Sequence, residues 1–97
     1  MEKINQHKPI IIKAVEYHYP HAKIYLFGSW ATGQNRPNSD IDLALDIGEP
    51  IDLHELDRIK RTIDNLDIPR KIDVVDIHGV SEDFKRMILK ERIAWKE

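Results

Sequence analysis

The stretch from Asp40 to Asp46 constrains the fold most, because aliphatic residues alternate in it with acidic or small ones without a break. Successive side chains of a strand point to opposite faces, so the three aliphatic residues share one face, and the three aspartates share the other with Ala44. Such a strand belongs in a sheet that buries one face against helices. We therefore expect a sheet whose second, acidic face is open.

Other apolar patterns supply the remaining elements of the predicted fold. Short apolar runs predict strands, and apolar residues at helical spacing predict helices. The expected strands are 24–27, 40–46 and 72–77, and the expected helices are 3–18, 52–66 and one that begins after Ser81. With a short helical segment at 30–32, this order predicts an α/β (α+β) domain, a small mixed β-sheet with helices packed on one face.

Three residues bear on where the helices begin. Asp52, with Glu55 three residues later, forms a capping box, and Ser81 is a typical N-cap. Pro9 fits poorly inside the first helix. That helix is therefore also compatible with a start at Pro9, where a missing N–H does no harm.

Length and composition narrow the class of protein. The 97 residues suit one domain, residues 1–97. Fifteen Lys and Arg against 17 Asp and Glu give a net charge of −2, which argues against a bulk electrostatic grip on nucleic acid but not against a local basic patch. No cysteine is present for a disulfide, a thiolate zinc site or a cysteine nucleophile. The apolar runs are too short to span a membrane or form a secretory signal, so we expect a cytoplasmic protein.

Gly28 and Ser29 form the first candidate binding feature, since they follow an apolar strand and precede a short helical segment. Glycine permits a sharp turn and a close approach to a ligand, and free N–H groups at such a turn attract an anion. The pair is thus a candidate phosphate cradle. Taken alone, the pair is weak evidence for a binding site, and an ordinary strand-to-helix turn with a serine cap is the simpler interpretation.

Three aspartates form the second candidate feature. Asp40 and Asp42 project to the same side of a strand, where a cation would relieve their mutual repulsion, and one or two carboxylates with phosphates suit Mg²⁺. Asp73 points to the opposite face of its strand from its apolar neighbours Ile72 and Val74. It reaches the open face of the sheet if the strand 72–77 lies beside the strand 40–46. Three carboxylates could then hold two metal ions, with Asp73 placed to accept a proton. The alternative is a set of solvated surface acids, as we expect for Asp76.

The combination of these features resembles a known superfamily. Gly28-Ser29, a spacer of ten residues, Asp40-x-Asp42 and the later Asp73 are similar to the signature of nucleotidyltransferases of the DNA polymerase beta type. The resemblance is closest to the minimal nucleotidyltransferases (MNT proteins) of prokaryotes and covers about residues 22–93. It implies the polymerase beta-like fold, with Gly28 and Ser29 binding the phosphates of ATP. It also implies that the three aspartates ligate Mg²⁺, with two ions expected, and act in catalysis.

The same resemblance implies a reaction and a partner. The reaction would be transfer of a nucleoside monophosphate, AMP from ATP, to a hydroxyl with release of pyrophosphate. MNT proteins pair with a helical HEPN-type toxin encoded nearby and act as its antitoxin, by adenylylating a tyrosine, by masking, or both. One alternative is a catalytically silent module that neutralises its partner by binding or that senses Mg-ATP. A homo-oligomer is also compatible with the sequence.

One departure from the family pattern concerns the phosphate site. Many relatives have Arg directly after Gly-Ser, where this chain has Trp30. Arg36 in the following loop is a candidate replacement for phosphate binding, and Trp30 either packs in the core or stacks on a base.

Several other side chains have a plain alternative role. Apolar residues that either pack on the core or meet a partner occur near both ends, namely Tyr17, Tyr19, Ile93, Ala94 and Trp95. The basic run Arg58, Lys60 and Arg61 suits a solvated helix face. The histidines show no metal-ligand spacing.

Overall fold

Helices and strands alternate along the part of the chain that the computed structural model describes, which is residues 2–97, with side chains from residue 4 onward. Most of these elements lie where the sequence patterns predict them. The order is α1 (Glu2–His18), β1 (Lys23–Phe27), α2 (Ser29–Thr32), β2 (Ile41–Asp46), α3 (Leu53–Asp64), β3 (Ile72–Asp76), α4 (Glu82–Glu91) and β4 (Ile93–Lys96). No helix in this part of the chain has the length and apolarity needed to cross a membrane.

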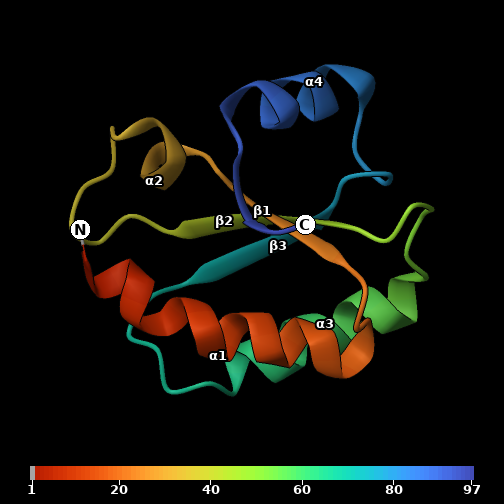
Figure 1. Ribbon diagram of the computed structural model, residues 1–97, viewed down its shortest axis with the longest axis horizontal. Coiled ribbons are helices and arrows are strands. Elements are labelled where there is room, and N and C mark those ends of the chain that lie inside the picture. Colours follow the sequence, from red (N-terminus) through yellow and green to blue (C-terminus); the bar gives the residue numbers. More distant parts are fainter. Residues whose placement is uncertain (1) are drawn as a thin grey trace.

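The four strands form one mixed sheet in the order β3-β2-β1-β4. β1 pairs antiparallel with both β2 and β4, whereas β2 and β3 run parallel. Figure 1 shows α1 and α3 together on one side of this sheet and α4 on the other. The predicted fold class, a small mixed α/β domain, is confirmed.

The alternation in β2 sorts its side chains as predicted. Ile41, Leu43 and Leu45 are completely buried on the face that α1 and α3 cover. Each fully buried aliphatic side chain contributes about 1.5–3 kcal/mol relative to exposure. The helices contribute matching apolar stripes, in which the fully buried residues include Ile11, Val15 and Ile59.

Helix α1 differs from one expectation, because it begins at Glu2 and continues through Pro9. Pro9 lies on the exposed side of the helix, so the backbone hydrogen bond that it cannot donate is lost where water is available. Ile4, before the proline, and Ile11, after it, are both buried against the sheet. This shared apolar face explains why the helix does not start at Pro9.

The second face of the sheet is less open than predicted. Ile88 of α4 packs there with Tyr25 and Phe27 of β1 and with Ala44 of β2, in an apolar cluster of its own. The expectation of helices on one face only therefore needs correction. Helix α4 covers part of this face because the acidic residues of the face lie toward the strand ends, while the residues between them are apolar and must be shielded from water.

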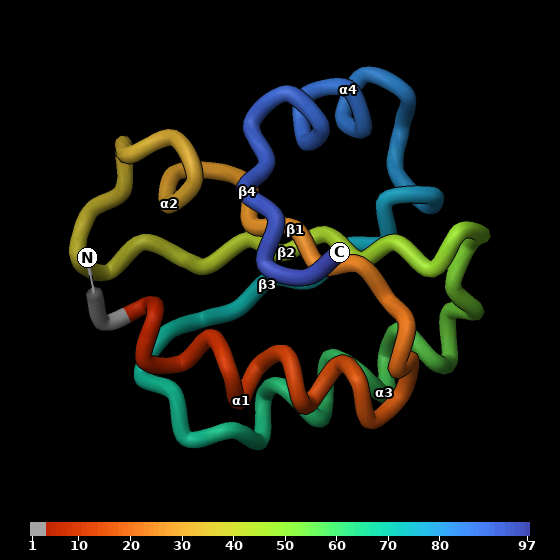
Figure 2. The backbone as a smooth tube through the Cα atoms, in the orientation of Figure 1, coloured from red at the N-terminus to blue at the C-terminus, as the bar shows by residue number. Residues whose placement is uncertain are grey.

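Strand β4 was not expected from the sequence. It is only four residues long and follows α4 almost directly. It pairs with β1 and forms the edge strand of the sheet, as the tube in Figure 2 shows. Trp95 of this strand is buried in the main core, which favours the packing alternative for that residue. Ile93 and Tyr17 stay exposed, whereas Tyr19 packs against the core.

Asp76 corrects another expectation, because it is buried with a relative exposure of 5% rather than lying on the surface. Its parity places it on the same face of β3 as the core residue Val74. Its carboxylate accepts hydrogen bonds from the backbone N–H of Ile51 at 2.8 Å and of His78 at 2.9 Å. These bonds compensate for its burial and join β3 to the segment before α3.

Candidate functional site

Strand pairing brings the predicted aspartates together. In the parallel register of β2 and β3, Asp42 lies directly beside Asp73. On its other side Asp42 is paired with Phe27, the last residue of β1 before Gly28. The condition on which the role of Asp73 depended, adjacency of the two strands, is therefore met.

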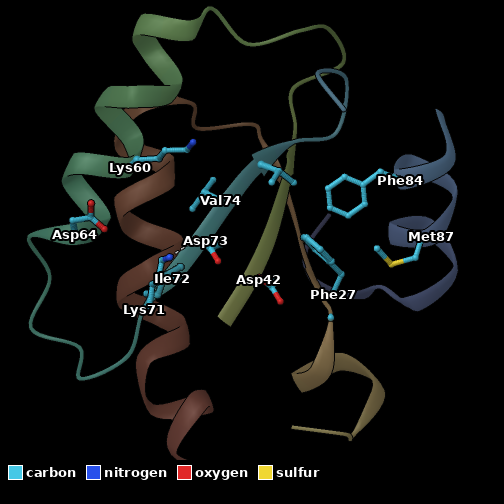
Figure 3. A pocket seen from close by; sticks show the side chains of 12 residues that line it. Phe27, Asp42, Lys60, Asp64, Lys71, Ile72, Asp73, Val74, Phe84 and Met87 are labelled. Carbon is cyan, nitrogen blue, oxygen red and sulfur yellow. Dashed lines mark ion pairs between the residues drawn. The ribbon is translucent and has the colours of Figure 1, made fainter. Parts of the chain in front are cut away.

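A cavity of about 580 Å³ opens above these residues. Figure 3 shows Asp42 and Asp73 between two walls, one of which α3 provides and the other α4. The α3 side contributes Lys60 and Asp64, and the α4 side contributes Phe84 and Met87. The other lining residues are Phe27, Gly28, Lys71, Ile72, Val74 and Val75. The cavity therefore has an acidic floor, two lysines and an apolar wall.

The charge of Asp42 is disfavoured in this environment. Burial raises the pKa of its carboxyl above the ordinary value of 3.8, and the charges of Asp73, Asp40 and Glu91 raise it further. Asp40 raises the pKa of Asp42 although it is itself exposed and lies just before the start of β2. A carboxylate held close to other negative charges attracts a cation.

The carboxylates of this site suit a magnesium ion that also binds substrate. No three acidic or histidine side chains of the described residues are arranged to hold a metal ion by themselves. The neighbouring carboxylates of Asp42 and Asp73 nevertheless fit Mg²⁺, which commonly uses one or two carboxylates and completes its shell with substrate phosphates and water. Participation of Asp40 in a three-carboxylate set stays a prediction.

Gly28 is required by the geometry at the end of β1. Its backbone has φ 76° and ψ −157°, a conformation that residues with a side chain rarely adopt. A Cβ atom built there would lie 2.3 Å from Oδ2 of Asp42. Only glycine lets the backbone come this close to the carboxylate. Ser29, which is half-buried, follows as the first residue of α2.

Glu91 is a residue of this site that the sequence patterns did not single out. It is the last residue of α4, and its carboxylate accepts a hydrogen bond from the N–H of Gly28 at 3.2 Å. Its charge also acts on the pKa of Asp42. One signal was available in the sequence, since an acid in the last turn of a helix opposes the helix dipole.

Trp30 packs rather than facing the cavity. Its ring is buried in the main core, with the guanidinium of Arg70 5.1 Å from the ring centroid. Its indole N–H donates a hydrogen bond of 2.9 Å to the carbonyl of Ser39, the residue before Asp40. Arg36 is exposed in the intervening loop and does not line the cavity, so its role in phosphate binding stays a prediction.

Replacing Trp30 with Phe should loosen the segment that carries Asp40. Loss of the indole hydrogen bond is expected to lower the free energy of unfolding by about 1 kcal/mol or more, which lowers the thermal midpoint by roughly 4–8 °C. Hydrogen exchange of residues 33–40 should become faster. Trp95→Phe is the matched control, because it removes an indole from the same core. Equal loosening of this segment in both variants would contradict the anchoring role.

The basic run on α3 divides into two parts. Arg58 and Arg61 are exposed and pair along the helix with Glu55 at 3.5 Å and Asp57 at 2.8 Å, as a solvated face would. Lys60 instead lines the cavity. Lys71, the second cation there, lies 3.8 Å from the carboxylate of Asp73.

Comparisons with known proteins agree with this geometry. The family described as "Polymerase beta, Nucleotidyltransferase" matches residues 10–95. A Haemophilus influenzae relative named "Probable protein adenylyltransferase MntA" is 35% identical over 78 residues, covering 80% of this chain and 68% of the relative.

Solved structures share the fold. A crystal structure of a toxin-antitoxin with AMP-PNP matches with a TM-score of 0.77 at 25% identity, covering 91% of this chain and 71% of that one. A tri-AMPylated Shewanella oneidensis HEPN toxin in complex with MNT antitoxin matches with a TM-score of 0.70 at 24% identity, covering 98% and 71%. The acidic floor beside Gly28, the family match and these relatives lead to one conclusion. The chain belongs to the minimal nucleotidyltransferases of the polymerase beta family, and it is an enzyme of the nucleotidyltransferase class.

Proposed function

We propose that this protein transfers AMP from Mg-ATP to a hydroxyl of a HEPN-type partner protein and thereby acts as the antitoxin of a toxin–antitoxin pair. The observation that carries the proposal is the placement of Asp42 beside Asp73 in a cavity that Gly28 also lines. The similar proteins support ATP as the substrate and a HEPN-type protein as the partner. They include a protein adenylyltransferase, a complex with AMP-PNP and an AMPylated HEPN toxin.

In this proposal the chemistry is an in-line displacement at the α-phosphorus of ATP. The acceptor oxygen forms a bond to that phosphorus, the bond to the bridging oxygen breaks, and pyrophosphate leaves. Asp73 would accept the proton of the acceptor hydroxyl. Asp40, Asp42 and Asp73 would hold Mg²⁺, which offsets negative charge on the phosphates when bound. Gly28 and Ser29 would orient the phosphates.

The walls of the cavity suit the two organic groups that must meet there. Phe84 and Met87 offer an apolar surface to a flat group, such as the adenine base or an acceptor tyrosine ring. Lys60 and Lys71 place two positive charges in the same space, where they would offset phosphate charge. The cavity thus offers separate surfaces for charged and for apolar parts of the substrates.

Intact-mass measurement of the partner tests this function. We expect the HEPN-type protein encoded beside this chain, purified with it, to gain one or more AMP units on incubation with Mg-ATP. α,β-Methylene ATP is the control, because the bond that must break is replaced in it, and it should give no gain. A stable complex without any mass gain would contradict catalysis and support neutralisation by binding alone.

A further inference from the structure

The carboxylate of Glu91 occupies the donor that the phosphate cradle would use. Its Oε1 accepts from the N–H of Gly28 at 3.2 Å, although the two residues are 63 positions apart in sequence. Figures 1 and 2 show how the end of α4 descends next to the junction of β1 and α2. An anionic oxygen therefore already lies where a phosphate oxygen would bind.

Glu91 also adds a negative charge to an acidic site. Asp42 experiences the charges of Asp73, Asp40 and Glu91 together. A free triphosphate that approaches Gly28 would meet this repulsion and would also compete with Glu91 for the same N–H. A triphosphate that carries a divalent cation meets less repulsion, because the cation compensates for both sets of negative charge.

We propose that Glu91 is a specificity-determining residue, which makes the site accept a cation-complexed nucleoside triphosphate and exclude the free triphosphate anion. This inference rests on the proposed function, since it concerns the same nucleotide site. Nothing in it requires Glu91 to bind the metal ion or to take part in bond formation. The carboxylate discriminates through its charge, which its hydrogen bond to the Gly28 N–H holds at the phosphate cradle.

The test is Glu91→Gln, which keeps an oxygen that can accept from Gly28 but removes the charge. The affinity for ATP is measured by calorimetry, first with EDTA present. Under this condition we expect the variant to bind ATP about fivefold more tightly than the unchanged protein does, because removal of one like charge at about 4 Å predicts an effect of this size. In Mg²⁺ the two affinities should agree within about twofold. Glu91→Ala, as a second variant, should shift affinity in the same direction, with the thermal midpoint checking that each variant folds.

Glu82→Gln is the matched control, since it makes the same change at the opposite end of α4, roughly 13 Å away along the helix axis. Its ATP affinity should not change in either buffer. Unchanged affinity of Glu91→Gln in EDTA would overturn the inference. An equal gain in ATP affinity in both buffers would also overturn it, because Glu91 would then block the site without regard to the cation. A loss of affinity in Mg²⁺ alone would overturn it as well, because Glu91 would then be a metal ligand. Failure of the unchanged protein to bind Mg-ATP is a separate result, which would overturn the proposed function itself.

Discussion

Asp42→Asn should abolish adenylyl transfer while leaving the protein without ligand at least as stable as before. The loss of transfer follows from the position of Asp42 at the centre of the acidic floor, beside both Asp73 and Gly28. Loss of a metal-binding carboxylate at such a position removes several kcal/mol of transition-state stabilisation. We therefore expect AMP transfer to fall by about a thousandfold or more.

The effect of this substitution on stability depends on pH in a defined direction. The pKa of Asp42 is raised above 3.8 in the folded protein, by burial and then by the charges of Asp73 and Asp40. The folded state therefore binds this proton more tightly than the unfolded state does. The contribution of Asp42 to stability is greatest below its unfolded pKa and is lost as pH rises through its folded pKa.

Thermal unfolding of the variant and the unchanged protein, compared between about pH 3 and pH 7, measures this effect. The stability of Asp42→Asn relative to the unchanged protein should increase with pH across this window and then level off. Asp64→Asn is the matched control, because it removes an acid from the α3 wall of the same cavity. It should reduce transfer far less than Asp42→Asn does, because Asp64 is exposed on α3 and lies outside the Asp42–Asp73 pair. A loss of transfer in Asp64→Asn as large as in Asp42→Asn would contradict the special role of Asp42.

Gly28→Ala should give the largest loss of stability together with loss of nucleotide binding. The new Cβ would lie 2.3 Å from Asp42 Oδ2 and 3.2 Å from its Cγ, in a backbone conformation with positive φ that alanine disfavours. Backbone strain and the clash together are expected to cost about 3 kcal/mol. At roughly 4–8 °C per kcal/mol, the thermal midpoint should fall by about 12–24 °C.

Two further variants separate strain from the clash. Gly48→Ala is the control for strain, because Gly48 also has a positive φ, of 86°, but a Cβ there meets nothing within 4 Å. It should cost only about 1 kcal/mol. In the double variant Gly28→Ala with Asp42→Ala, the clashing carboxylate is absent, so part of the stability should return. Equal losses in Gly28→Ala and Gly48→Ala would show that the contact with Asp42 is unimportant.

Interactions between residues close in sequence were the most predictable part of this fold. The N-caps expected at Asp52 and Ser81 are present, since their side chains accept from His54 and Phe84 N–H groups respectively. The alternation in β2 was equally informative, because the face of each side chain follows from backbone geometry alone. Pro9 was misleading, since the loss of one exposed hydrogen bond is outweighed by apolar contacts on both sides of it.

The sequence named the candidate residues of the site, but it predicted their arrangement in space only if two particular strands lie side by side. Gly28, Asp42 and Asp73, which the resemblance singled out, line one cavity, and their roles stay predictions. The adjacency on which the role of Asp73 depends is one that no local pattern specifies. Glu91 was missed because its partner, Gly28, lies 63 residues away. The burial of Asp76 was missed for a similar reason, since Ile51 donates to it across 25 residues.

The sequence by itself therefore determined the class of the fold, the faces of β2, the N-caps of α3 and α4 and the family to which the chain belongs. Tertiary structure alone decided that β3 lies beside β2, that α4 covers part of the second face and that Glu91 reaches the phosphate cradle. The physical reason is one of range. Propensity, capping and alternation act over a few residues, whereas register and packing depend on which distant apolar surfaces bury one another best.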